Sequence, residues 1–122
     1  MKFNVISFLI VITCIGITIY FVLKPPPIYP VEKLRENSPQ ITKAYQLAEK
    51  YSSTFKKIKC YCGCMNGSKN DHSSLRTCFE SDHGSTCVIC IDEAIFVGEQ
   101  KKLNTPDLQI KQLIDKKYSG NN

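Results

Sequence analysis

The sequence predicts an all-α protein, in which an N-terminal transmembrane helix precedes a small helical domain organised around a Cys/His-rich loop. An uncharged apolar run opens the 122-residue chain, helical periodicity recurs in three later segments, and six of the seven cysteines fall within 31 residues. We therefore divide the chain into a transmembrane anchor at residues 1–24, a Pro-rich linker at 25–37 and a Cys-rich helical domain at 38–122.

The first element is the apolar run 3–23, which has 21 residues and no charge. At a rise of about 1.5 Å per residue, a helix of this length spans about 30 Å, the thickness of the hydrocarbon core. A cleaved signal peptide is the alternative, but its apolar region is usually shorter, about 7–15 residues, and small residues precede the cleavage site. Here the run leads directly into Lys24 and three prolines. We favour an uncleaved single-pass anchor, in which Cys14 is a lipid-facing residue.

The charges around this anchor leave its orientation open. Lys24, Lys33 and Arg35 outnumber Lys2 and the amino terminus, which mildly favours a cytoplasmic domain by the positive-inside rule. A two-residue leader before a lone apolar helix is instead typical of an export anchor.

The segments after the anchor predict a spacer and three helices. Residues 25–30 (PPPIYP) form a stiff, extended stretch of polyproline type. Ser38 is a good N-cap and Pro39 suits the first helical position, so an amphipathic helix is expected over 38–54. A short helical turn is expected at 74–79 and a second helix at 88–101. The third helix begins at the Thr105-Pro106 signal and ends before Gly120.

The candidate site is the Cys/His-rich loop. The loop contains six cysteines and the chain's only two histidines. All eight side chains are candidate metal ligands: Cys60, Cys62, Cys64, His72, Cys78, His83, Cys87 and Cys90. Gly63 lets the backbone turn tightly within CYCGC, and Cys87-Val88-Ile89-Cys90 lies where the next helix begins. Helix N-termini stabilise thiolates. Eight nitrogen and sulfur donors can serve two four-coordinate ions or one binuclear site.

Two other states of these cysteines remain open. Six cysteines outside the cell can form three disulfides in a disulfide-stapled interaction domain, and Cys87 with Cys90 can act as a redox dithiol in a thiol–disulfide oxidoreductase. Disulfides within C-x-C close strained rings and leave the histidines without a role. We therefore favour a metal ion, copper or zinc, in a protein that is not an enzyme, without excluding the other two states.

Charge and motifs argue against other functions. The chain carries a net +5, but residues 60–99 carry −4 and no Arg-rich stripe with interleaved aromatics is present. Such a stripe is the footprint of nucleic-acid binding, so we expect no nucleic-acid partner. No serine elbow, paired-carboxylate motif or phosphate-binding glycine loop points to hydrolysis. The predicted partners are the membrane and a metal ion; the sequence names no protein partner.

The order of these motifs resembles a known family. KKIKCYCGCMNG, DHSSLRTCF, DHGSTCVICIDEA and IKQLIDKKY, spread between Ile41 and Tyr118, resemble the PCYCGC-motif proteins of bacteria and archaea. All six cysteines and both histidines follow the family order, while Lys59 replaces the motif proline. Members of this family are often exported and membrane-attached, many as lipoproteins, so the resemblance implies an extracytoplasmic domain. It implies no established activity.

Overall fold

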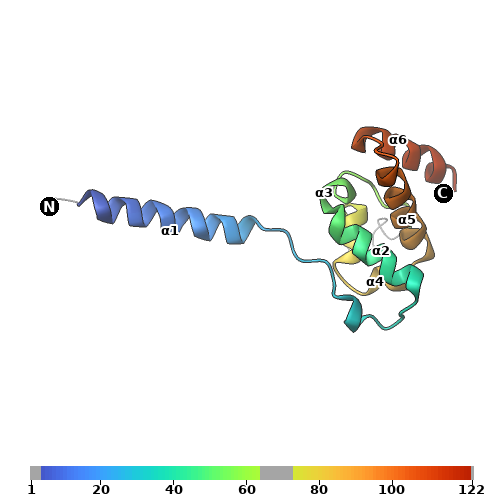
Figure 1. Cartoon of the computed structure of the whole chain (residues 1–122), viewed down its shortest axis with the longest axis horizontal. Helices are drawn as coiled ribbons and strands as arrows, with labels where there is room; N and C mark the ends of the chain where they lie inside the picture. The colour runs from blue at the N-terminus through green and yellow to red at the C-terminus, as the bar shows by residue number, and fades with distance from the viewer. Residues whose placement is uncertain (1–3, 64–72, 122) are drawn as a thin grey trace.

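The computed structural model describes residues 4–63 and 73–121, and it confirms the all-α prediction, since no strand occurs among these residues. Helix α1 (Val5–Leu23) projects away from the other helices and continues into an extended segment (Figure 1). It buries no side chain and is long and apolar enough to cross a membrane. The Thr13 hydroxyl donates back to the carbonyl of Leu9 at 3.0 Å, so this polar side chain is satisfied within the helix.

The predicted helices of the domain are present with shifted ends. Helix α2 (Pro39–Lys50) begins as expected, with the amide of Ile41 donating to the Ser38 hydroxyl, but the backbone leaves the helical region at Tyr51 before α3 (Ser52–Phe55). Helix α5 (Val88–Lys102) matches its predicted range closely. The other elements are η1 (Val31–Lys33), η2 (Leu75–Phe79), α4 (His83–Thr86), α6 (Asp107–Tyr118) and η3 (Ser119–Asn121).

Helix α6 begins one residue later than the Thr105-Pro106 signal predicts. Pro106 occupies the N-cap position, and the Thr105 hydroxyl donates to the Gln100 side chain at 3.1 Å. Thr105 therefore ties the loop to the end of α5 and does not cap α6.

The core lies between α2, α5 and η2. Tyr45 of α2 and Phe55 of α3 both meet Phe79 of η2 edge to face, with ring centroids 4.9 and 5.9 Å apart. These rings are buried, and Cys60, Cys78 and Cys90 belong to the same buried cluster. The aromatic side chains of α2, α3 and η2 and the three cysteines thus form one continuous core.

The Pro-rich segment also contacts this core. Ile28, Tyr29, Val31 and Leu34 pack partly buried against it, and the amide of Tyr29 donates to the carbonyl of Phe79 at 2.8 Å. Apolar burial and a backbone hydrogen bond therefore attach residues 28–34 to the helical domain.

Candidate metal centre

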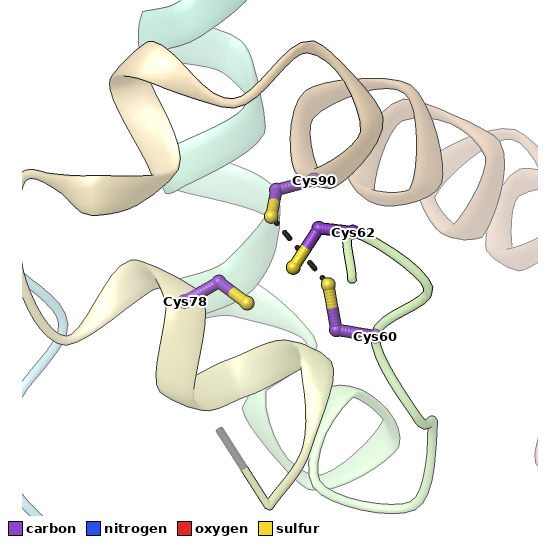
Figure 2. Close-up of side chains that lie close together, drawn as sticks. All are labelled: Cys60, Cys62, Cys78 and Cys90. Atoms are coloured by element: carbon purple, nitrogen blue, oxygen red, sulfur yellow. Dashed lines mark hydrogen bonds between the residues drawn. The ribbon is translucent and has the colours of Figure 1, made fainter. Parts of the chain in front are cut away.

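Three separate segments bring four cysteines together. Cys60 and Cys62 lie on the chain that follows α3, Cys78 comes from η2 and Cys90 from the first turn of α5, and their sulfurs point toward one another (Figure 2). The four Sγ atoms all lie within 4.8 Å of one another, and the Cys60 and Cys90 sulfurs are 3.5 Å apart. In a tetrahedral site with metal–sulfur bonds of about 2.3 Å, sulfurs are separated by about 3.8 Å. The cluster is therefore close to the size that one ion requires.

Local backbone interactions hold these segments in place. The amide of Leu75 donates to the carbonyl of Ile58 at 2.8 Å, which holds the chain before Cys60 against η2. Gly63 follows Cys62 with a φ of +76°, a left-handed conformation that favours glycine. The predicted role of Gly63 in a tight turn is thus consistent with its backbone.

A second set of four donors overlaps the first. Cys62, His83, Cys87 and Cys90 also place one donor atom each within 4.8 Å of all the others. Helix α4 supplies His83, and Cys87 is the N-cap of α5, where its sulfur accepts the amide of Cys90 at 3.5 Å. Cys62 and Cys90 belong to both sets.

Hydrogen bonds within the cluster lower the pKa of some cysteines and raise the pKa of others. Hydrogen bonds from Cys60 and Cys90 lower the pKa of Cys78 to about 6. The Cys90 thiol and the amides at the start of α5 lower the pKa of Cys87 to about 5. Cys90 donates to its sulfur neighbours, which raises its own pKa. The surroundings therefore favour the thiolate form of Cys78 and Cys87, and thiolate is the form that ligates metals.

A buried carboxyl group positions the CYC segment. Glu93 of α5 is fully buried, and its Oε1 accepts the amide of Tyr61, between Cys60 and Cys62, at 2.8 Å. Burial and the neighbouring cysteine sulfurs raise the Glu93 pKa to about 9, so this carboxyl is protonated at neutral pH. The sequence analysis did not identify Glu93. Its position three residues after Cys90, on the same face of a predicted helix, was the available signal.

Tyr61 is held from a second helix as well. Its hydroxyl donates to Asp115 of α6 at 2.8 Å. The amide and the hydroxyl of one residue thus connect the CYC segment to α5 and α6, and this limits how far Cys60 and Cys62 can move.

The structure brings six of the eight candidate ligands together: Cys60, Cys62, Cys78, His83, Cys87 and Cys90. Cys64 and His72 lie outside the described residues. Two acidic residues, Asp82 and Asp92, are close in the sequence to His83 and Cys90, and both contact other side chains. Asp82 pairs with Arg35 at 2.6 Å, and Asp92 accepts the Tyr118 hydroxyl at 2.5 Å.

The cluster is largely closed to solvent. Cys60, Cys78 and Cys90 are each at most 1% exposed, whereas Cys62 is partly exposed. A cavity of ≈ 560 Å³ reaches Cys62 between the starts of α2 and α5, and its walls include Ile41, Tyr61 and Ile89. Cys62 is therefore the point at which the first set of four cysteines meets a solvent-accessible cavity.

Comparison with known proteins identifies a family and no closer relative. A family model described as "Protein of unknown function with PCYCGC motif" matches residues 28–121, most of the chain. Searches of curated proteins and of solved structures found no match. The matched region begins at Ile28, where the structure shows the first contact of the Pro-rich segment with the core.

Proposed function

This chain belongs to the PCYCGC-motif family, whose function is unknown, and we propose that it is a membrane-anchored protein that binds a soft or borderline metal ion, copper or zinc. The observation that carries the proposal is the convergence of four cysteine sulfurs, from three segments, within 4.8 Å of one another. Thiolate and imidazole donors suit Zn(II) and Cu(I). The proposed ligands come from the six described Cys and His side chains, while Cys64 and His72 remain predictions from the sequence.

Three features of the site support a metal ion over disulfides. The Cys60 and Cys90 sulfurs are 3.5 Å apart, whereas bonded sulfurs are about 2.05 Å apart. Several thiolates crowded into a buried site repel one another unless a cation compensates them. In addition, His83 shares a set of donors with three cysteines, which a disulfide framework does not require.

Metal analysis of the full chain, purified in detergent under reducing and anaerobic conditions, tests this proposal. We expect at least one copper or zinc ion per chain by elemental analysis, and loss of that ion in a Cys78→Ser/Cys90→Ser variant. Cys14→Ser, in α1, is the matched control and should retain the ion. A metal-free, folded protein would contradict the proposal, and a Cys87–Cys90 disulfide that forms in that protein once the reductant is removed would favour thiol–disulfide exchange instead.

Competition between metals tests whether the site binds copper or zinc. If copper is the physiological ion, Cu(I) should displace Zn(II) from the full chain and should bind far more tightly in the presence of a chelator of known affinity. If zinc has a structural role, its removal by a chelator should lower the thermal unfolding temperature, because the ion binds only the folded state.

We further propose that residues 1–24 anchor the domain of residues 38–122 to the membrane through the segment 25–37, with the domain on the extracytoplasmic side. The apolar α1, which buries none of its side chains, supports the anchor. Protease added to intact cells should remove the domain while leaving a cytoplasmic marker uncut. Protection of the domain until the cells are lysed would place it on the cytoplasmic side.

A further inference from the structure

The second set of donors is not needed to bind a single ion. Cys60, Cys62, Cys78 and Cys90 already offer four sulfurs, yet His83 and Cys87 lie within 4.8 Å of Cys62 and Cys90. Four of these six side chains come from beyond residue 73, on η2, α4 and the start of α5. The fold therefore places two additional soft donors directly beside a complete four-sulfur site.

The number of described donors determines how two ions can share this site. Two separate four-coordinate ions need eight ligands, whereas the two sets contain six different side chains, because both include Cys62 and Cys90. Among these six described side chains, two ions can each have four protein ligands only if two of the side chains bind both ions, and Cys62 and Cys90 are the two that both sets contain. The two coordination tetrahedra then share the edge between the Cys62 and Cys90 sulfurs.

The chemistry of the shared residues fits this arrangement. A thiolate sulfur has several lone pairs and can bridge two ions, whereas the nitrogen of a neutral imidazole has one lone pair available for a metal. Both shared residues are cysteines, and His83 occurs in only one set. The histidine thus occupies a terminal position, which is the only position that its donor atom can fill.

The charge of the site favours a second ion as well. One divalent ion held by four thiolates leaves a double negative charge in a largely buried site, where uncompensated charge is costly. A second divalent ion recruits one further thiolate, Cys87, and the neutral His83, so the complete centre carries a single negative charge. The segment 60–99, already at −4, contains no excess of basic residues to compensate the thiolates in another way.

From this juxtaposition we propose a thiolate-bridged binuclear metal centre. Cys62 and Cys90 bridge two ions. Cys60 and Cys78 complete the coordination of the first ion, and His83 and Cys87 complete the coordination of the second. This inference rests on the proposed metal-binding function, but it adds a fixed stoichiometry and a bridging role for two named cysteines.

Titration of the metal-free full chain with Co(II), in detergent under anaerobic conditions, tests the bridge without any substitution. Tetrahedral Co(II) is paramagnetic, and two Co(II) ions joined by thiolates couple antiferromagnetically. We expect two equivalents to bind, with the paramagnetic resonance signal per cobalt falling severalfold between the first and the second equivalent.

Three variants distinguish the terminal ligands of each ion from a bridging ligand. Cys87→Ser should bind one Co(II) and keep the full signal, because only the second ion loses a terminal ligand. Cys78→Ser should likewise lose one ion. Cys62→Ser should weaken the binding of both ions, because each loses one bridging ligand while Cys90 still joins them, whereas the control Cys14→Ser should behave as the wild type. Far-UV circular dichroism confirms that each variant retains its helices.

Each contrary result has a separate meaning. Binding of no cobalt would contradict the proposed function itself. Binding of one ion only would overturn the binuclear centre and leave the metal-binding function standing. Two ions without magnetic coupling would overturn the bridge, because each ion would then have its own ligands.

Discussion

Glu93 connects the chemistry of the cluster to the backbone that carries it. Its buried carboxyl group accepts the amide of Tyr61 at 2.8 Å, and it lies on the helix that also supplies Cys90. The raised pKa, about 9, keeps this group neutral, so it adds no negative charge beside the cysteines. One side chain thus orients Cys60 and Cys62 relative to Cys90.

Replacing Glu93 tests this positioning role. Glu93→Ala should lower the free energy of unfolding by about 2–3 kcal/mol, because a buried amide loses its acceptor and a cavity remains. Metal affinity should fall about 10-fold to 100-fold, as for other residues that orient ligands. Glu93→Gln, which resembles the neutral acid, should retain both properties. Denaturant unfolding and metal competition measure the two effects; equal damage by both variants would contradict the role.

Lys59 precedes the CYCGC segment, at the position where the sequence analysis expects the motif proline. Its side chain is exposed, and its ammonium group lies 5.4 Å from the centre of the Tyr61 ring. Within the described residues, its backbone amide donates no hydrogen bond that a proline would remove. Lys59→Pro should therefore stabilise the fold by about 0.4–1 kcal/mol by restricting the unfolded chain. Thermal unfolding measures this gain, and a loss of stability would show that the local backbone does not accept proline.

At the scale of elements, Asp107 joins three helices. Its carboxylate accepts the Thr54 hydroxyl of α3 at 2.9 Å, Lys57 at 2.8 Å and Lys101 of α5 at 3.0 Å, and it lies in the first turn of α6. Hydrogen bonds from Lys57 and Lys101 hold the pKa of this carboxyl well below its usual range. The position also suits the positive end of the α6 dipole.

Asp107→Asn should cost about 1–2 kcal/mol at pH 7, because the neutral amide loses two charge-assisted hydrogen bonds. The folded-state pKa of Asp107 is depressed, so its stabilising contribution is complete above the unfolded pKa of about 4 and is lost as the pH falls below it. The difference in unfolding free energy between wild type and variant should therefore shrink from pH 7 to pH 3. A difference that stays constant over this range would exclude a role for the charge.

At the scale of the whole molecule, Arg76 fastens the segment after α1 to the domain. Arg76 is 4% exposed, and its guanidinium donates to the Ser52 hydroxyl at 2.7 Å, to Glu80 and to the carbonyl of Pro26. Together with the packing of Ile28 and Tyr29 on the core, these bonds connect the extended chain after α1 to η2. The distance between the domain and the end of α1 is therefore restricted.

Substitution of Arg76 tests this attachment. Arg76→Met should lower the free energy of unfolding by about 2–4 kcal/mol, because buried partners lose a charged donor. It should also speed proteolysis between Pro25 and Val31. Arg76→Lys keeps the charge without the planar fork and should have an intermediate effect. Unchanged cleavage in Arg76→Met would mean that apolar packing alone holds the segment.

Much of the fold was predictable because its signals are local. Ser38 and Pro39 mark the start of α2, and the CVIC segment begins α5 as expected, since caps and helical periodicity depend on neighbouring residues. The break at Tyr51 and the helix α4 were not predicted. The break lies inside a continuous apolar stripe, and α4 is a single turn, too short for a periodic pattern.

The sequence by itself determined the helical class, the apolar N-terminal element, the family and the set of candidate ligands, because composition, periodicity and motif order are written along the chain. Only the tertiary structure decided which ligands meet. Cys60 and Cys90 are thirty positions apart in the sequence, but their sulfurs are 3.5 Å apart. Cys62 and Cys90 belong to both sets of donors. Such distances depend on how α5 and η2 pack around the core, and packing between distant segments leaves no periodic signal in the sequence.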